Sequence, residues 1–141
     1  MQTAATVTKF ARAAVDKTSV ETILETVGDL STIQVMQNMV LVATYIRPEK
    51  TKGGLFIPES SIQEDVWQGK VGLVLKLGPT AFVDDEEQRF GEGEYKVTPK
   101  LHDWCVYRVG DAWDLTLRGV ACRLVADHNV RLVINDPEEI Y

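Results

Sequence analysis

The chain has 141 residues, of which 45 % are hydrophobic and 26 % charged, and this composition is ordinary for one globular domain with a modest core. Its net charge of −6 and its scattered Lys and Arg residues argue against nucleic acid as the main partner, because phosphate binding needs clustered basic residues. No apolar run approaches the roughly 20 residues of a membrane span, and the N-terminus lacks the continuous apolar core of a secretory signal. We therefore expect a cytoplasmic protein that binds neither nucleic acid nor membrane.

The first 30 residues have a helical period, with two sets of apolar residues at i, i+3, i+4 and i+7. The sets are Val7, Phe10, Ala11 and Ala14, followed by Val20, Ile23, Leu24 and Val27. Residues 18–21 fit a capping box and Gly28 fits a C-cap. We predict two short helices, or one helix broken near residues 16–19, as an extension over residues 1–30. Its apolar stripes pack either on the neighbouring sheet or on another subunit or protein.

From Ile33 onward the chain is rich in short apolar runs separated by turn residues, and this pattern predicts a mainly β barrel or sandwich. The expected strands are 39–42, 70–77, 104–107, 115–117, 121–125 and 130–134. Gly78-Pro79 closes the second run, and the acidic, glycine-containing stretch 84–94 is typical of an exposed loop or hairpin tip. We expect one β-domain over residues 31–134 and an extended, exposed acidic tail over residues 135–141 unless another element holds it.

One polar segment, residues 47–61, carries an apolar triplet that has little reason to join a core. Gly53-Gly54 gives the backbone freedom immediately before the triplet Leu55-Phe56-Ile57, and Pro58 follows it. An apolar triplet on a flexible polar loop is a candidate docking element. The alternative is an ordinary hairpin strand, with Leu55 and Ile57 facing the core and Phe56 outside.

The order of these motifs resembles the GroES family of ten-kilodalton co-chaperonins. Thr51-Lys52-Gly53-Gly54-Leu55-Phe56-Ile57-Pro58 resembles the mobile loop of that family. The runs at 40–42, 69–79, 102–107 and 130–134 resemble its strands and turns in the same order, so that the resemblance covers about residues 33–134. The sequence departs from the family pattern at Gln37-Asn38-Met39, at His102, at Thr80 and at both ends.

The resemblance implies a small, partly open β-barrel with a protruding mobile loop and a β-hairpin. It also implies a co-chaperonin that caps an ATP-driven chaperonin ring and assists protein folding, with the nucleotide bound by the partner. The docking residues would be Thr51, Gly53, Gly54, Leu55, Phe56, Ile57 and Pro58. The first and last strands would join neighbouring subunits of a homo-oligomer, in the family a seven-membered ring, through Val40, Val42, Leu132 and Ile134.

We find no pattern typical of an enzyme, a metal site or a cofactor site. His102 and Cys105 lie three apart on an expected strand and point to opposite faces, so that they would not converge on one metal. Cys105 and Cys122 are expected to be buried, reduced thiols. A second hypothesis stays open: a structural protein, for example in a virus particle, that reuses this barrel, because a fold alone does not fix function.

Overall fold

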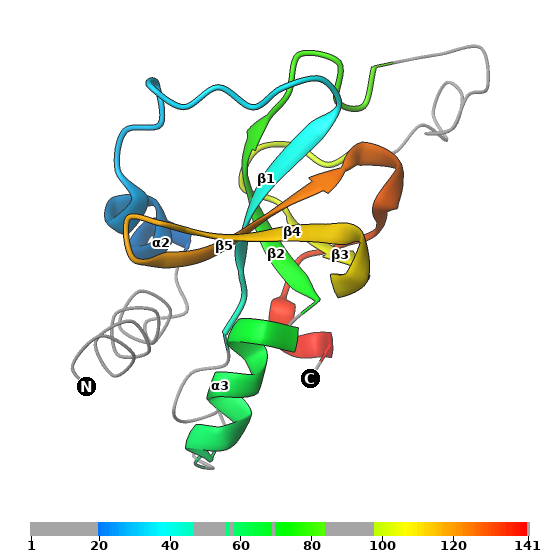
Figure 1. The fold of residues 1–141 in the computed structure, drawn as a ribbon. Coiled ribbons are helices and arrows are strands. Elements are labelled where there is room, and N and C mark those ends of the chain that lie inside the picture. Colours follow the sequence, from blue (N-terminus) through cyan, green and yellow to red (C-terminus); the bar gives the residue numbers. More distant parts are fainter. Residues whose placement is uncertain (1–19, 47–55, 57, 69, 84–97, 141) are drawn as a thin grey trace.

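The computed structural model describes residues 20–46, 56, 58–68, 70–83 and 98–140. Within them the chain is mainly β, as the sequence predicted (Figure 1). The strands are β1 (Met39–Thr44), β2 (Val71–Leu77), β3 (Trp104–Tyr107), β4 (Ala112–Leu117), β5 (Val120–Ala126) and β6 (Val130–Ile134). The helices are α2 (Val20–Val27) and α3 (Glu59–Gln68), with short 3-10 turns at Val109–Asp111, Asp127–Asn129 and Pro137–Ile140. The predicted helix over Val7–Ala14, the capping residues 18–19 and the acidic loop 84–94 lie outside the described residues.

The six strands form one antiparallel sheet in the order β4-β5-β1-β2-β3-β6. Because β4 and β6 are its two edges, the described sheet remains open, as the resemblance implied. Strand β1 lies near the middle, between β5 and β2. Alternate side chains of a strand point to opposite faces, and β1 accordingly serves two hydrophobic clusters. Leu41 and Ala43 belong to one cluster, and Val40 and Val42 to the other.

Helix α2 packs on the chain's own sheet. Ile23 and Val27 are fully buried in the first of the two clusters, and Val20 and Leu24 lie partly buried against it. Its apolar stripe therefore has an intramolecular partner, which decides between the two possibilities left open for this stripe. Gly28 ends the helix as a C-cap, because its φ of 68° is accessible to glycine and its N–H donates to the carbonyl of Leu24 at 2.9 Å.

The turn after β2 is held at close range. A Cβ on Gly78 would lie 2.2 Å from the carbonyl oxygen of Gln37, so only glycine fits there. Buried Asp127 fastens the same region: its carboxylate accepts from the N–H of Phe82 at 3.0 Å and from Nδ2 of Asn38 at 2.9 Å. One carboxylate thus joins the chain before β1, the chain after β2 and the turn before β6.

The C-terminal tail is held on the domain, which is the exception that the expectation of an extended, exposed segment allowed. Pro137–Ile140 forms a short 3-10 helix, Pro137 is buried, and Ile140 lies against the first hydrophobic cluster. The burial of these two apolar side chains holds the tail on the domain, and composition alone gave no sign of it.

Candidate functional site: the β1–β2 connection and the β6 edge

The connection that holds the candidate docking loop starts from a rigid base. Tyr45 and Ile46, which follow β1, are buried, and the N–H of Tyr45 donates to the carbonyl of Val71 at 2.8 Å. The ring of Tyr45 meets the ring of Trp104 edge-on, with centroids 5.5 Å apart. The two ends of the connection are therefore fixed beside each other at Tyr45 and Val71.

Most of the predicted docking residues lie outside the described chain: Thr51, Gly53, Gly54, Leu55 and Ile57. Phe56 is described and is 78 % exposed, and Pro58 is also exposed. Phe56 thus presents its ring at the surface. Both interpretations of this segment, as a docking loop and as a hairpin strand, predicted this exposure.

Helix α3, which follows Pro58, was missed by the sequence analysis. The N–H of Ser61 donates to the carbonyl of Pro58 at 3.0 Å as the helix begins. Figure 1 shows α3 projecting from the body of the sheet. Two signals were present: Pro58 at the helix start, and Ile62 and Val66 four residues apart. The polar residues 59–61 are typical of a loop, and they outweighed these two helix signals in the prediction.

The four residues predicted for subunit contact fall into two groups. Leu132 lies on the edge strand β6 and is 47 % exposed, and Ile134 lies partly buried on the same strand. Val40 and Val42 depart from the expectation, because both are fully buried in the chain's own core. Strand β1 has a neighbour on each side, and the second hydrophobic cluster encloses Val40 and Val42, so these two side chains do not reach the surface.

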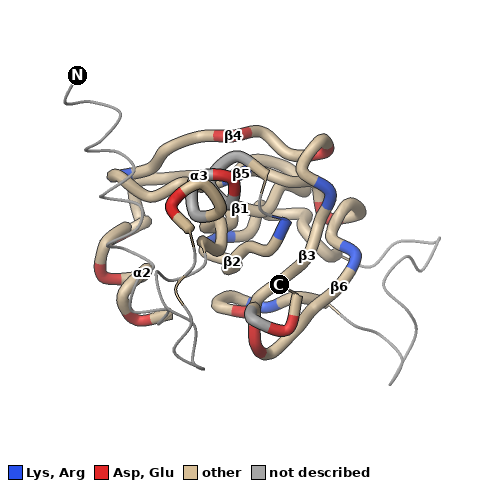
Figure 2. Tube along the Cα trace, turned by 90° about the horizontal axis from the view of Figure 1, so that it is seen from below, with Lys and Arg blue, Asp and Glu red and all other residues tan. Residues whose placement is uncertain are grey.

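Charges are spread over the described surface. Figure 2 shows acidic residues on α2, on α3 and near the C-terminus, and basic residues at separate places along the tube. Near β6, Nη2 of Arg108 donates to Oδ1 of Asp111 at 2.8 Å and holds the pKa of that carboxyl below its ordinary value, with a smaller contribution from Arg131. This pair is exposed, and we assign it no catalytic role.

The residues weighed for metal binding do not converge. Cys105 and Cys122 are buried, as expected, whereas His102 and His128 are exposed. No group of three or more His, Cys, Asp or Glu side chains in the described ranges is arranged to hold a metal ion. None of the helices within those ranges has the length and apolar character needed to cross a membrane.

These features define a small, open, antiparallel β-domain with an exposed phenylalanine on the connection between its first two strands. The family model described as "Chaperonin 10 Kd subunit" matches residues 32–130, most of the chain. The chain belongs to this family of co-chaperonins, and the resemblance seen in the sequence is confirmed. A comparison with curated proteins gives no match.

Proposed function

We propose that the chain is a co-chaperonin that caps an ATP-driven chaperonin ring and assists protein folding in the cytoplasm. The observation that carries the proposal is the family match over residues 32–130, which includes the whole connection between β1 and β2. The docking element is the loop of Thr51, Gly53, Gly54, Leu55, Phe56, Ile57 and Pro58. The exposure of Phe56 supports this assignment, because an aromatic ring at the surface is available to a hydrophobic groove of a partner.

The energetics favour weak individual loops that act together. Burying the three apolar side chains of the triplet offers about 1.5–3 kcal/mol each. Ordering the loop costs about 1–2 kcal/mol for each fixed residue, which offsets much of that gain. A homo-oligomer, in our proposal a seven-membered ring, presents several loops at once and raises the effective concentration of each later contact. Such a cap binds firmly as a whole and is released when the partner, which holds the nucleotide, changes state.

The β6 edge supplies one side of the proposed contact between subunits, through Leu132 and Ile134. In the described sheet β6 pairs with β3 alone and its other side carries no strand. A head-to-tail contact that uses this edge closes into a ring when the rotation between subunits is repeated. The structural role in a virus particle is favoured by no observation on this chain, whereas the family match favours the co-chaperonin.

The test combines native mass spectrometry with a refolding assay, in the presence of a chaperonin with and without ATP. We expect the wild-type oligomer to join the chaperonin only with nucleotide, and L55S/F56S/I57S to lose this binding and the stimulation of refolding. The matched control is V83S/L101S, which removes two exposed apolar side chains elsewhere on the domain and should leave binding intact. Equal binding by the loop variant and the wild type would refute the role of the loop.

A further inference from the structure

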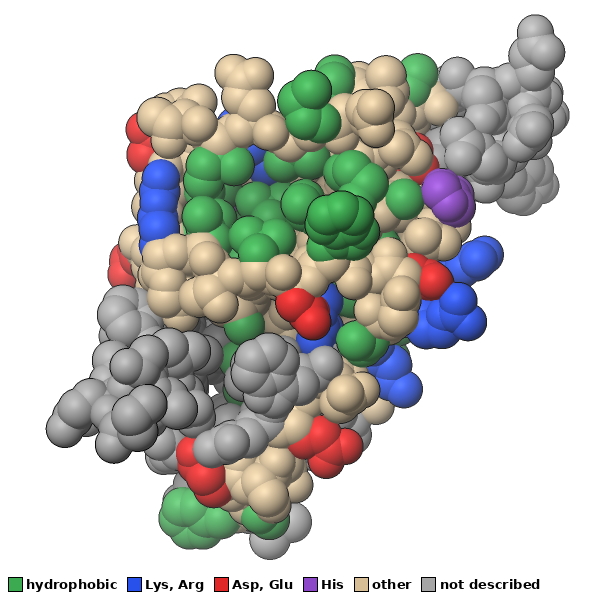
Figure 3. All heavy atoms as spheres, viewed as in Figure 1, with side chains coloured by type: hydrophobic (Ala, Val, Ile, Leu, Met, Phe, Trp, Pro, Cys, Tyr) green, Lys and Arg blue, Asp and Glu red, His purple; other side chains and the backbone are tan. Residues whose placement is uncertain are grey.

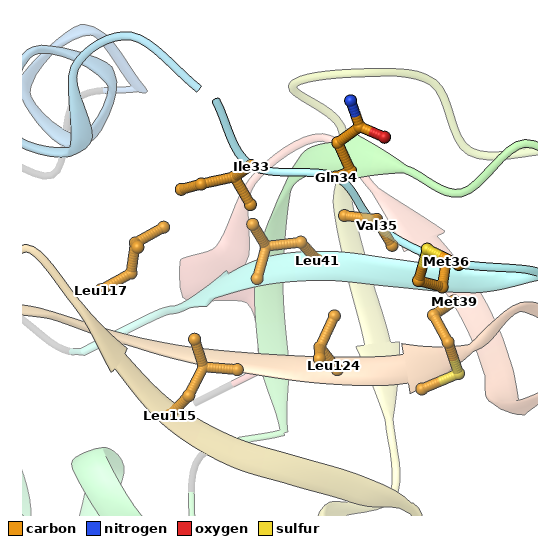
Figure 4. Close-up of a pocket in the computed structure, with 9 residues that line it drawn as sticks. All are labelled: Ile33, Gln34, Val35, Met36, Met39, Leu41, Leu115, Leu117 and Leu124. Carbon is orange, nitrogen blue, oxygen red and sulfur yellow. The ribbon is translucent and has the colours of Figure 1, made fainter. Parts of the chain in front are cut away.

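A hydrophobic groove lies on the described surface, and Phe56 is not among the residues that line it. Figure 3 shows it as a hollow of apolar side chains over β1, β5 and β4. Its volume is about 190 Å³. The lining residues come from β1, β4, β5 and the segment before β1: Ile33, Gln34, Val35, Met36, Met39, Leu41, Leu115, Leu117 and Leu124. In Figure 4 the apolar side chains converge on the hollow, whereas the amide of Gln34 points away from it.

The groove is an open side of the first hydrophobic cluster. Leu41 is a buried member of that cluster, and Leu115, Leu117 and Leu124 lie partly buried against it. The rim is open, since Met36 is 67 % exposed. Trp113 lies two residues before Leu115 on β4, and therefore on the same face of the sheet, and is 74 % exposed. Apolar side chains gathered in one exposed hollow indicate a surface that is covered in the working protein.

The size of the groove matches one aromatic side chain. An engineered apolar cavity of roughly 150 Å³ in another protein takes up a benzene ring. A hollow of about 190 Å³ is therefore suited to a phenyl ring with some neighbouring aliphatic atoms. The lining offers no charged side chain, so the occupant is expected to be uncharged at the point of contact.

The chain itself supplies such a group close by. Residues 1–19 lie outside the described residues. They directly precede Val20, which packs on the same cluster as the groove leucines. Arg118 fixes the other end of α2 beside the groove, because it follows Leu117 directly and donates to the carbonyl of Val27. The ten residues from Phe10 to Ser19 span about 15 Å if they are helical and about 33 Å if they are extended, which allows Phe10 to reach a neighbouring hollow. Within this segment Phe10 is the one aromatic residue, and it belongs to the apolar stripe with Val7, Ala11 and Ala14.

We propose that Phe10 occupies this groove in the same chain, so that the N-terminal segment covers the open side of the cluster formed by β1, β4 and β5. The proposal does not depend on the co-chaperonin role. It assigns a function to the stripe that starts at Val7, just as the burial of Ile23 and Val27 accounts for the stripe of α2.

A disulfide test measures the proximity directly. In the full chain, A11C, which keeps the ring of the neighbouring Phe10, is combined with M36C at the groove rim. The control combines A11C with T116C, because Thr116 is exposed on β4 between Leu115 and Leu117 and therefore points to the opposite face. The native thiols do not interfere, because Cys105 and Cys122 are buried. We expect an intrachain disulfide, seen by mass spectrometry after mild oxidation at low protein concentration, to form at least tenfold faster with M36C than with T116C.

Other outcomes overturn the proposal. A disulfide between two chains would show that a second copy fills the groove. Equal rates for the two pairs, or no bond in either, would show that Phe10 does not seat there.

A second measurement uses a fluorescent dye that binds exposed apolar surface. We expect F10S to raise the fluorescence of the bound dye at least twofold, because the groove is uncovered. F56S serves as the matched control: it removes an exposed phenylalanine outside the groove and should not raise the fluorescence. An F10S protein that binds no more dye than the wild type would refute the coverage of the groove by Phe10. Both readouts are independent of chaperonin binding.

Discussion

The guanidinium group of Arg118 donates hydrogen bonds to the backbone carbonyl of Val27 and, at 2.6 Å, to that of Asp29. Arg118 occupies the two-residue turn between β4 and β5, where it and Gly119 have φ values of 52° and 86°. The last carbonyls of a helix have no partner within the helix, and a cation near that end also interacts favourably with the helix dipole. One side chain thus fastens α2 to a hairpin about 90 residues further along the chain.

We expect R118A to lower the free energy of unfolding by about 1–3 kcal/mol, because partly buried helix carbonyls lose a charged donor. Urea denaturation measures the change. The matched control is R108A, since Arg108 is an exposed arginine paired with Asp111 at i, i+3, and its loss should lower the free energy of unfolding much less than R118A does. If the two variants are equally stable, Arg118 does not hold α2.

A second prediction concerns Asp127, the buried carboxylate that joins three turns. D127A leaves the N–H of Phe82 and the amide of Asn38 without this acceptor. Each buried donor that loses its acceptor costs about 1–3 kcal/mol. Allowing for relaxation, we expect D127A to lower the free energy of unfolding by about 2–4 kcal/mol. D127N keeps one acceptor oxygen and should cost less. Thermal unfolding of both variants tests this order, and a D127A protein as stable as the wild type would contradict it.

The sequence predicted the elements whose signals are local. Each expected strand is present within a few residues, although β4 begins at Ala112 rather than Leu115 and β1 continues to Thr44. The helical period over Val20–Val27 and the glycine at position 28 were also sufficient to predict helix α2 and the place where it ends. These features were predictable because alternation, the helical period and glycine each reflect the backbone of a few neighbouring residues.

The features that escaped prediction depend on pairing between distant strands. Val40 and Val42 belong to the first strand along the chain, and the sequence could not show that the face of that strand which carries them is covered. Arg123 is the clearest case: an arginine within a strand suggests a solvent-facing residue, yet it is fully buried. Its place is set by the pairing of β5 with β1 and β4, which brings Val42 and Asp114 opposite it. The open groove likewise depends on β1, β4 and β5 together.

The buried arginine provides a third prediction. Nε of Arg123 donates to Asp114 at 2.7 Å, and Nη1 donates to the hydroxyl of Tyr107 at 3.2 Å. We expect D114A to cost about 1.5–3 kcal/mol although Asp114 is half-exposed, because it removes a charged partner from a buried cation. In the R123M background the same D114A change should cost under 1 kcal/mol. A double-mutant cycle measures this coupling, and additive effects would show that the pair is not coupled.

The buried thiols predict how stability depends on pH. Burial raises the pKa of Cys105 and of Cys122 from 9.0 to about 12, and burial likewise raises the pKa of Tyr107 from 10.0 to about 12. When the pH lies between the ordinary pKa of such a group and its raised pKa, the group keeps its proton in the folded chain and has lost it in the unfolded chain. Stability from these groups is therefore complete below about pH 9 and decreases as the pH rises toward 12.

The corresponding experiment compares urea unfolding at pH 7 and pH 10.5 for the wild type and for C105A/C122A. The double variant starts from a lower stability at pH 7, because two buried side chains are shortened, but it should lose less on going to pH 10.5. Tyr107 is present in both proteins, so the difference between the two losses isolates the thiols. An equal loss in both proteins would show that the thiols do not contribute.

The last prediction concerns the β6 edge. L132E places a charge on an edge strand at a position that is 47 % exposed, so the change costs the folded subunit little, whereas a buried subunit contact would not accept an unpaired carboxylate. We expect L132E to shift the assembly from oligomer to monomer in analytical ultracentrifugation while far-UV circular dichroism stays unchanged. V83E is the matched control, since Val83 is 51 % exposed and lies outside the strands. An L132E protein that assembles as well as V83E would exclude this edge from the contact and leave the docking role of the loop to be judged by its own experiment.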